Sequence, residues 1–298
     1  MTDTRSVGDL DKRALKALAR RSDLKGLLQL AQHATALGAT GVLIWMARGT
    51  VYLPAAWLAH GLLLIFLFAP LHECIHRTAF RTRWLNDAVA WLCAAPLLLP
   101  PAYFRAFHLA HHRWTQDSAR DPELISGKPH TRAQYAWHLT GLPYWWERIE
   151  TTARQAMGRA SSPFLSPRDK PMVIREARVL IAVIALAVGG SVWLASDAVF
   201  VYVAIPALLG QPFLRAYLLA EHTGCPFVPQ MLRNSRTTHT SALVRRLAWN
   251  MPYHSEHHAY PAIPFHALPD AHRLLRERIE TQADGYVAVH HNIISDLK

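Results

Sequence analysis

The spacing of histidines is the feature of this chain that could do chemistry. Three clusters contain imidazoles three or four residues apart. In a helix, residues at i, i+3 and i+4 project from one face, so each cluster can converge on a metal ion. The clusters lie in the segments LHECIH, FHLAHHRWT and NMPYHSEHH, and their histidines are His72, His76, His108, His111, His112, His254, His257 and His258.

The number of histidines indicates how many ions they hold. Neutral imidazole suits iron, zinc, copper and nickel. A zinc site is complete with about four ligands, so eight or nine imidazoles are too many for one ion and enough for two. A ferritin-like carboxylate di-iron site needs two Glu-x-x-His motifs, and this sequence has one, Glu73 with His76. We therefore predict a histidine-rich dinuclear site, with iron if the chemistry uses oxygen.

Long apolar runs are the elements that must position these clusters. Hydrophobic residues make up 51% of the 298 residues and charged residues 18%, which is typical of a multi-pass membrane protein. Residues 85–104 are apolar but interrupted by three prolines, which favours a re-entrant segment over a straight span. The predicted fold class is all-α, with about four transmembrane helices in two hairpins, at residues 27–47, 51–71, 177–195 and 198–220.

The distribution of charge predicts the orientation. The formal net charge is +11, but no nucleic-acid-binding motif accompanies it, and we expect no nucleic-acid partner. In membrane proteins Lys and Arg collect in cytoplasmic loops. The connection around Ser196 and Asp197 has neither, whereas the segments around the clusters are basic. We therefore expect both termini and all three clusters in the cytoplasm, in a protein of a bacterial inner membrane.

We interpret the whole chain, residues 1–298, as a single membrane-bound domain. Residues 1–26 have no apolar run typical of a cleavable signal peptide. Basic residues and leucines are mixed over 9–27, which is typical of an amphipathic helix on an anionic membrane surface, although a solvated helix end has the same pattern. Residues 27–220 contain the membrane hairpins and a cytoplasmic insert, and 221–298 form a cytoplasmic cap with the third cluster.

One motif indicates a different function. HECIH matches His-Glu-x-x-His, the signature of zinc metalloproteases in which the glutamate acts as general base. An intramembrane zinc protease is therefore a distant alternative. It leaves six histidines in the other two clusters unexplained.

The three clusters resemble the histidine boxes of the integral-membrane fatty acid desaturase and hydroxylase superfamily. The resemblance covers essentially the whole chain. The segments HHRWTQDSARDPE and NMPYHSEHHAYPAIPFHALP are similar to those of the desaturase branch. It implies a di-iron centre held by the eight box histidines, O2 as co-substrate and a lipid or fatty acyl substrate entering from the bilayer. Desaturation of an acyl chain is the expected reaction. The alternatives within the superfamily are a hydroxylase, a carotenoid-type oxygenase and an oxidative fatty acid decarboxylase.

The resemblance also implies a further histidine between the second and third boxes. His222 follows directly from an apolar run and His239 lies in a polar segment. We prefer His222 because site residues are best held by rigid elements. Ligating histidines usually donate their second ring N–H to an oxygen atom, and the nearby candidates for such partners are Glu73, Asp117, Asp121, Glu221, Asn250 and Glu256.

The reaction needs electrons from elsewhere. The sequence contains no His-Pro-Gly-Gly haem signature, no Cys-x-x-Cys knuckle and no Gly-rich nucleotide loop. We therefore expect a separate electron donor of the ferredoxin, rubredoxin or cytochrome type, docking on the basic cytoplasmic face.

Overall fold

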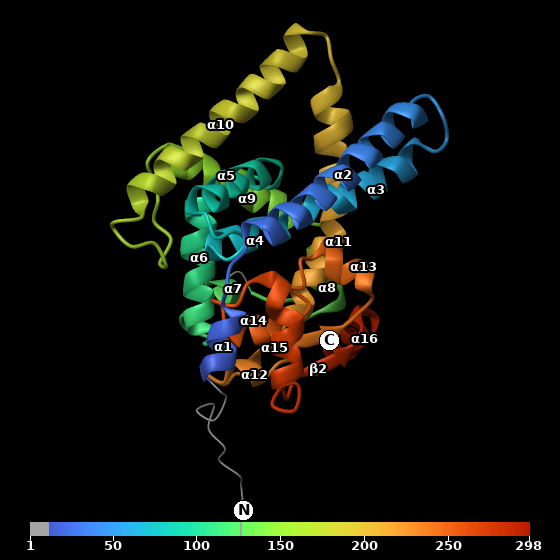
Figure 1. The fold of residues 1–298 in the computed structure, drawn as a ribbon. Coiled ribbons are helices and arrows are strands. Elements are labelled where there is room, and N and C mark those ends of the chain that lie inside the picture. Colours follow the sequence, from blue (N-terminus) through green and yellow to red (C-terminus); the bar gives the residue numbers. More distant parts are fainter. Residues whose placement is uncertain (1–11, 126) are drawn as a thin grey trace, which may run out of the picture.

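The computed structural model describes residues 12–125 and 127–298, and this part of the chain is mostly helical (Figure 1). The predicted amphipathic N-terminal helix lies partly outside the described residues. Its described part contains the short helix α1 (Lys12–Leu18). A tight turn then leads into the first long helix.

The first predicted hairpin is confirmed as a pair of helices. Helix α2 (Asp23–Ala47) begins at Ser22, whose hydroxyl accepts the backbone N–H of Lys25. Helix α3 (Leu53–Ile65) returns toward the start of α2 and continues after a short break into α4 (Phe68–His76). The hairpin therefore brings the first histidine box back to the end at which α2 begins.

The predicted interruption in the middle apolar segment is a sharp bend. Helix α5 (Arg83–Ala94) and a 3₁₀ turn (Ala95–Leu97) are followed by α6 (Pro101–Trp114), at an angle of 95°. Proline suits the first turn of α6, where its missing N–H has no helical partner to lose. The pair forms a broken span or a re-entrant loop, and α6 carries the second box.

The second hairpin consists of α10 (Lys170–Trp193), a π-helical turn (Phe200–Ala204) and α11 (Ile205–His222). Arg48 at the tip of the first hairpin forms an ion pair with Asp197 at the tip of the second. Both tips therefore lie at the same end of the molecule, as Figure 1 shows.

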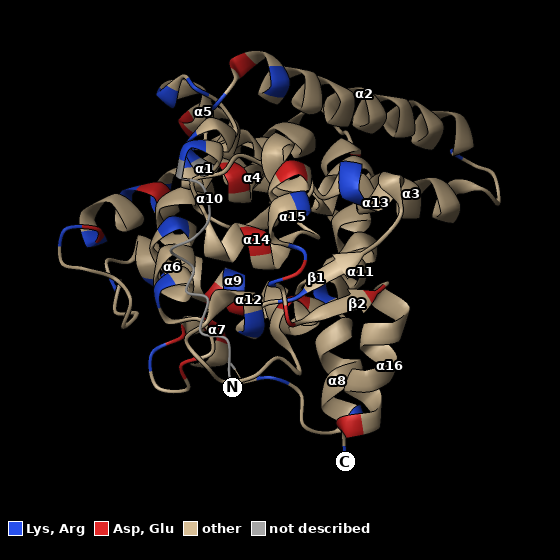
Figure 2. Cartoon of the chain, turned by 60° about the horizontal axis from the view of Figure 1, so that its bottom comes forward, with Lys and Arg blue, Asp and Glu red and all other residues tan. Residues whose placement is uncertain are grey.

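Three of the described helices are long and apolar enough to cross a membrane, and the bent pair makes a fourth if it is one span. They correspond to three of the four predicted spans. Helix α10 occupies the remaining predicted span and is not among the three, so its passage through the membrane stays a prediction. Figure 2 shows how few charged residues α2 and α3 carry. The three helices are Asp23–Ala47, Leu53–His76 and Phe200–His222.

Helices α3 and α11 approach each other at two glycines. A Cβ atom built on Gly61 would lie 2.2 Å from the carbonyl oxygen of Pro206, and one on Gly210 would lie 2.2 Å from that of Gly61. Only residues without a side chain allow backbones to come this close, as is common between membrane helices. This contact fixes the position of α11, whose last residue is His222.

The remaining segments are mostly short helices, which we call the cap. Two three-residue strands within it depart from the predicted all-α class, and they pair in parallel with Thr237 opposite Gln282. Such short strands leave no alternating pattern to detect. The cap elements are α7 (Pro122–Ile125), α8 (Arg132–Leu139), α9 (Leu142–Ala156), α12 (Met231–Asn234), β1 (Thr237–His239), α13 (Ala242–Leu247), α14 (His254–Ala259), α15 (Leu268–Leu275), β2 (Gln282–Asp284) and α16 (Tyr286–Asp296).

Candidate metal centre

Four helices bring the predicted histidines together. The first box lies at the end of α4, the second on the last turns of α6 and the third on α14, while α11 ends at His222. Helix α4 stops directly after His76, because Arg77 adopts a left-handed backbone conformation. The structure places all eight box histidines and His222 in one cluster, and eight of these nine side chains are buried.

The cluster divides into two groups of nitrogen atoms. Within each group, one ring nitrogen from every histidine lies within 4.8 Å of all the others. His254 adjoins the smaller group, because its Nε2 is 2.9 Å from that of His222. Each group takes histidines from three helices. The larger group contains His72, His76, His108, His112 and His257, and the smaller one contains His111, His222 and His258.

The spacing within the groups fits metal coordination. When two nitrogens bind the same metal ion at about 2.0–2.1 Å, the distance found for zinc, and their bonds meet at a right angle, the nitrogens lie about 2.9 Å apart. The observed pairs of Nε2 atoms come close to this value. Their separations are 2.8 Å for His72 and His257, 2.9 Å for His108 and His112, and 3.1 Å for His111 and His222.

Several ring nitrogens have no other partner. The Nε2 atoms of His76 and His258 are buried and make no hydrogen bond with any described residue. A buried polar atom without a partner is costly, and a metal ion would satisfy both atoms. Burial also lowers the pKa of His254, His257 and His258 well below the usual value. These rings are therefore neutral, which is the form that binds metal.

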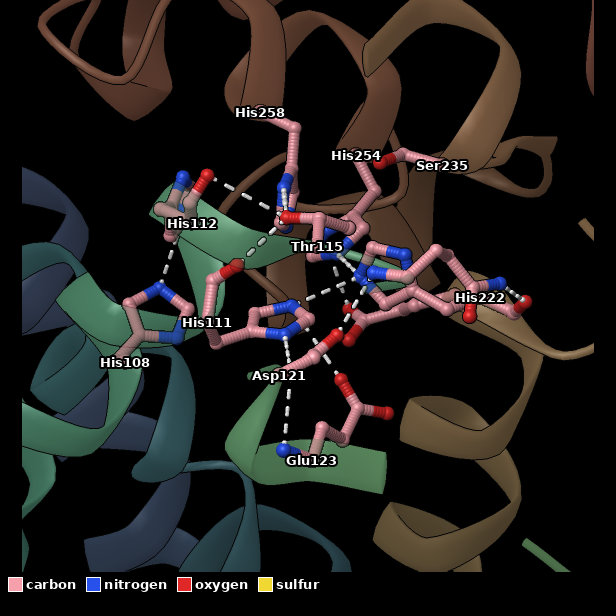
Figure 3. Close-up of polar contacts among 12 residues, drawn as sticks. His108, His111, His112, Thr115, Asp121, Glu123, His222, Ser235, His254 and His258 are labelled. Carbon is pink, nitrogen blue, oxygen red and sulfur yellow. Dashed lines mark hydrogen bonds and ion pairs between the residues drawn. The ribbon is translucent and has the colours of Figure 1, made fainter. Parts of the chain in front are cut away.

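Oxygen atoms orient the rings of the smaller group, as Figure 3 shows. His111 Nδ1 lies 2.8 Å from a carboxylate oxygen of Asp121, and His222 Nδ1 lies 3.1 Å from the carbonyl oxygen of Asn234. His258 Nδ1 lies 3.2 Å from the hydroxyl of Thr115. Each contact leaves Nε2 facing the centre of the group, the arrangement expected for metal ligands with fixed tautomers.

Two of the predicted orienting residues contact box histidines. Asp121 bonds to His111, and Glu221 has a carboxylate oxygen 3.4 Å from Nδ1 of His254. Glu123, which sequence reasoning missed, also reaches the site with a carboxylate oxygen 3.3 Å from His111 Nε2. Its position directly after Asp121 and a proline was the available signal.

The other four predicted orienting residues bond elsewhere. Asp117 pairs with the exposed Arg120, and Asn250 donates to the carbonyl of Phe265. Glu73 and Glu256 are fully buried behind the boxes and accept hydroxyl hydrogen bonds of 2.6 Å, from Thr78 and Thr237 respectively. Glu256 also bonds to His272 on α15. These two glutamates brace the box helices.

The two candidates for the ninth histidine lie in different surroundings. His222 is 1% exposed and belongs to the smaller group. His239 is exposed on β1 and bonds to Gln282 in the neighbouring strand. The structure therefore brings His222, and not His239, to the cluster. Its place at the end of an apolar helix was the signal in the sequence.

The geometry defines a class of protein: a multi-pass helical membrane protein with a buried site suited to two metal ions. A profile of the family described as "Fatty acid desaturase" matches residues 30–290. The chain therefore belongs to the fatty acid desaturase family. The suspected resemblance is confirmed.

Individual relatives are 25–34% identical to this chain over the residues that align. The sphingolipid delta(4)-desaturase/C4-monooxygenase of Mus musculus is 25% identical over 96% of this chain and 86% of its own length. The sn-1 oleoyl-lipid 12-desaturase of Synechocystis sp. is 34% identical over 32% of this chain, and the sn-1 acyl-lipid omega-3 desaturase (ferredoxin) of Nostoc sp. is 33% identical over 28%. These two matches span only 28% and 23% of the relatives' lengths.

Proposed function

We propose that this chain holds two iron ions in the nine-histidine cluster and uses O2 to desaturate a fatty acyl chain. The division of the cluster into two groups of nitrogen atoms is the observation that carries the proposal. Imidazole is a suitable ligand for iron, and the family supports oxidation of a lipid. When bound, the metal and O2 would supply the removal of hydrogen from an unactivated C–H bond.

The protein's own contribution is to hold the chain beside the metal and exclude water. A cavity of about 320 Å³ adjoins the cluster, and Phe68, Leu99, Phe104 and Phe107 are among its apolar lining residues. His72 and His108 are among its other lining residues. An acyl chain against these aromatic rings would place a methylene near the metal site, and such positioning accounts for a large share of catalysis.

Hydroxylation by the same site is the second candidate. The mouse relative is named both a desaturase and a monooxygenase, and the two reactions begin with removal of the same hydrogen. The position of the chain carbon relative to the metal decides between an alkene and an alcohol.

We also propose that the histidine boxes face the cytoplasm of a bacterial cell and receive electrons from a separate protein. The hairpin tips lie opposite the boxes, and the tip around Asp197 has no Lys or Arg. The name of the Nostoc relative includes ferredoxin, which supports a donor of that kind.

Metal analysis and lipid analysis together test the proposal. Purified protein should contain about two irons per chain, the number that the two nitrogen groups can hold. Cells that express the gene should gain an unsaturated lipid relative to cells without it, detected by mass spectrometry. A single zinc without iron would contradict the proposal and favour the metalloprotease reading. A hydroxylated lipid in place of the alkene would favour the second candidate.

A further inference from the structure

The cavity beside the histidines is lined by a cation, Arg215, that pairs with no carboxylate of the described residues. Arg215 lies on α11 within the membrane-spanning stretch Phe200–His222 and lines the cavity. Among the described residues it makes no ion pair and no hydrogen bond, and its Nε atom is buried without a partner. Charged residues inside membrane helices are costly and mark functional sites. The sequence contained this signal, an arginine in an apolar run.

The carboxylates that line the cavity are engaged elsewhere. Lys128 lies 3.8 Å from Glu123, and Arg148 forms an ion pair with Glu147. The third carboxylate of the lining, that of Glu221, lies 3.4 Å from His254. Arg215 is therefore the cation of this lining that lies in no ion pair with a described carboxylate, and its donors are available to a group that enters from outside.

Two guanidinium groups that line the cavity lie close to one tyrosine ring, that of Tyr144. The guanidinium carbon of Arg215 lies 4.5 Å from the ring centre of Tyr144, and that of Arg148 lies 5.9 Å from it. The Tyr144 hydroxyl donates to the carbonyl of Leu97 at 2.7 Å, which fixes the ring. Guanidinium groups held in this way present paired donors that match the geometry of a carboxylate.

The guanidinium pair lies close to the metal site. Arg215 precedes His222 by seven residues on one helix, which is about 10 Å along the axis. On α6, the ring of Tyr103 lies 5.1 Å from the Arg148 guanidinium carbon. Tyr103 precedes His108 by five residues, about 8 Å along the helix axis. An anion bound here and the carbon to be oxidised would occupy the same cavity.

We infer that Arg215, assisted by Arg148, binds the carboxylate of an unesterified fatty acid. The inference rests on the proposed function and adds the chemical class of the substrate head group. A cavity of about 320 Å³ is at the small end of the range for ligand sites. It suits a single chain with a small head group better than a glycerolipid with two chains.

Binding measurements on the iron-loaded protein in detergent test this inference. Palmitic acid and methyl palmitate have the same chain and differ in the carboxylate charge. We expect the wild type to bind the acid more tightly than the ester. The Arg215→Gln variant should bind the acid about tenfold to a hundredfold more weakly, the usual effect of losing a hydrogen bond to a charged group, and the ester about equally well.

A matched control is available on the cap. Arg154 is exposed on α9 and pairs with Glu150, so Arg154→Gln should leave both dissociation constants unchanged. Arg215→Lys should retain part of the preference for the acid. Iron content, measured on every variant, separates a failure of this inference from a failure of the metal site.

Three results would overturn the inference. The first is equal binding of acid and ester by the wild type. This measurement needs no variant, so it remains decisive even if Arg215→Gln does not fold. The second is an equal loss of acid and ester binding in Arg215→Gln. The third is an Arg215-dependent preference for lysophosphatidic acid over palmitic acid, which would assign the site to a phosphate head group.

Discussion

At the residue scale, a single carboxylate holds one metal-facing ring in place. Asp121 bonds to His111 and also accepts the backbone N–H groups of Gln116 and Glu123. Because these bonds fix the carboxylate before a metal ion binds, the His111 ring is already oriented for coordination. We expect Asp121→Asn to lower iron affinity about tenfold to a hundredfold, the usual effect of losing such a partner. Competition with a chelator measures the affinity.

The control for this prediction is four residues away. Asp117 pairs with the exposed Arg120 and contacts no box histidine among the described residues. Asp117→Asn should therefore leave iron affinity unchanged. Equal affinities in the two variants would contradict the role assigned to Asp121.

The choice of the ninth histidine has a direct consequence for metal content. His222→Ala should lower the iron content toward about one per chain, because the smaller group of nitrogens loses one of its central members. His239→Ala should keep the wild-type content, since that ring lies outside the cluster. Inductively coupled plasma analysis of both purified variants gives the answer. A loss of iron in His239→Ala alone would reverse the assignment.

His138, which lines the cavity beside the histidine cluster, should make stability depend on pH. Burial, together with the nearby charge of Arg215, lowers the pKa of His138 from 6.5 to about 4. The unfolded chain binds this proton below pH 6.5 and the folded chain does not until about pH 4, so stability falls as pH falls through this window. At pH 5 this effect lowers the free energy of unfolding by about 1 kcal/mol after allowance for solvent screening, and His138→Gln should remove it.

Thermal unfolding in detergent at pH 7 and pH 5 tests this dependence. The wild type should lose more stability between the two values than His138→Gln. His291, exposed on α16, provides the control, and His291→Gln should behave as the wild type does. The same loss in all three proteins would show that His138 does not contribute.

At the scale of elements, the contact between α3 and α11 depends on two glycines. Gly210→Ala would drive a methyl group into the backbone of Gly61, and overpacking of this kind costs about 1–3 kcal/mol. Gly38 on α2 has open space around its Cα. Gly38→Ala should therefore be neutral or slightly stabilising, because alanine is the better helix former.

Melting temperature and iron content of the two variants decide the matter. We expect Gly210→Ala to melt earlier and to bind iron less well, because α11 positions His222. If both variants melt at the same temperature, the two helices can separate without cost and the contact does not position the site.

The elements were predictable to different degrees. Apolar runs of membrane length predicted the first hairpin and α11, and three prolines predicted the bend before α6. The helical conformation of the boxes was predictable because the spacing of their histidines matches the helical repeat. Contacts between distant segments leave no such periodicity. The pairing of Thr237 with Gln282 and the approach of Arg215 to Tyr144 therefore had to come from the structure.

At the scale of the molecule, the ion pair between Arg48 and Asp197 predicts the topology. Because this pair joins the two hairpin tips, Val51 and Ser196 should be accessible from the same side of the membrane. Single cysteines at these positions should react with an impermeant maleimide from outside the cell, and Ser295→Cys near the C-terminal end should not. The three native cysteines are buried and should give little background.

Two outcomes would contradict this topology. Labelling of Val51→Cys and Ser196→Cys from opposite sides would show that the hairpins do not run side by side. Labelling of Ser295→Cys from outside would place the cap, and with it the histidine boxes, on the outer face.

The short strand pair has a consequence for the order in which the protein is assembled. Thr237 on β1 bonds to Glu256, which braces the third box, and the same strand is held by Gln282 on β2. Synthesis proceeds at about 5–20 residues per second and early segments fold first. The first two boxes are therefore in place seconds before the ribosome reaches the residues that support the third. Iron loading is expected to be an event of the finished chain rather than of the growing one.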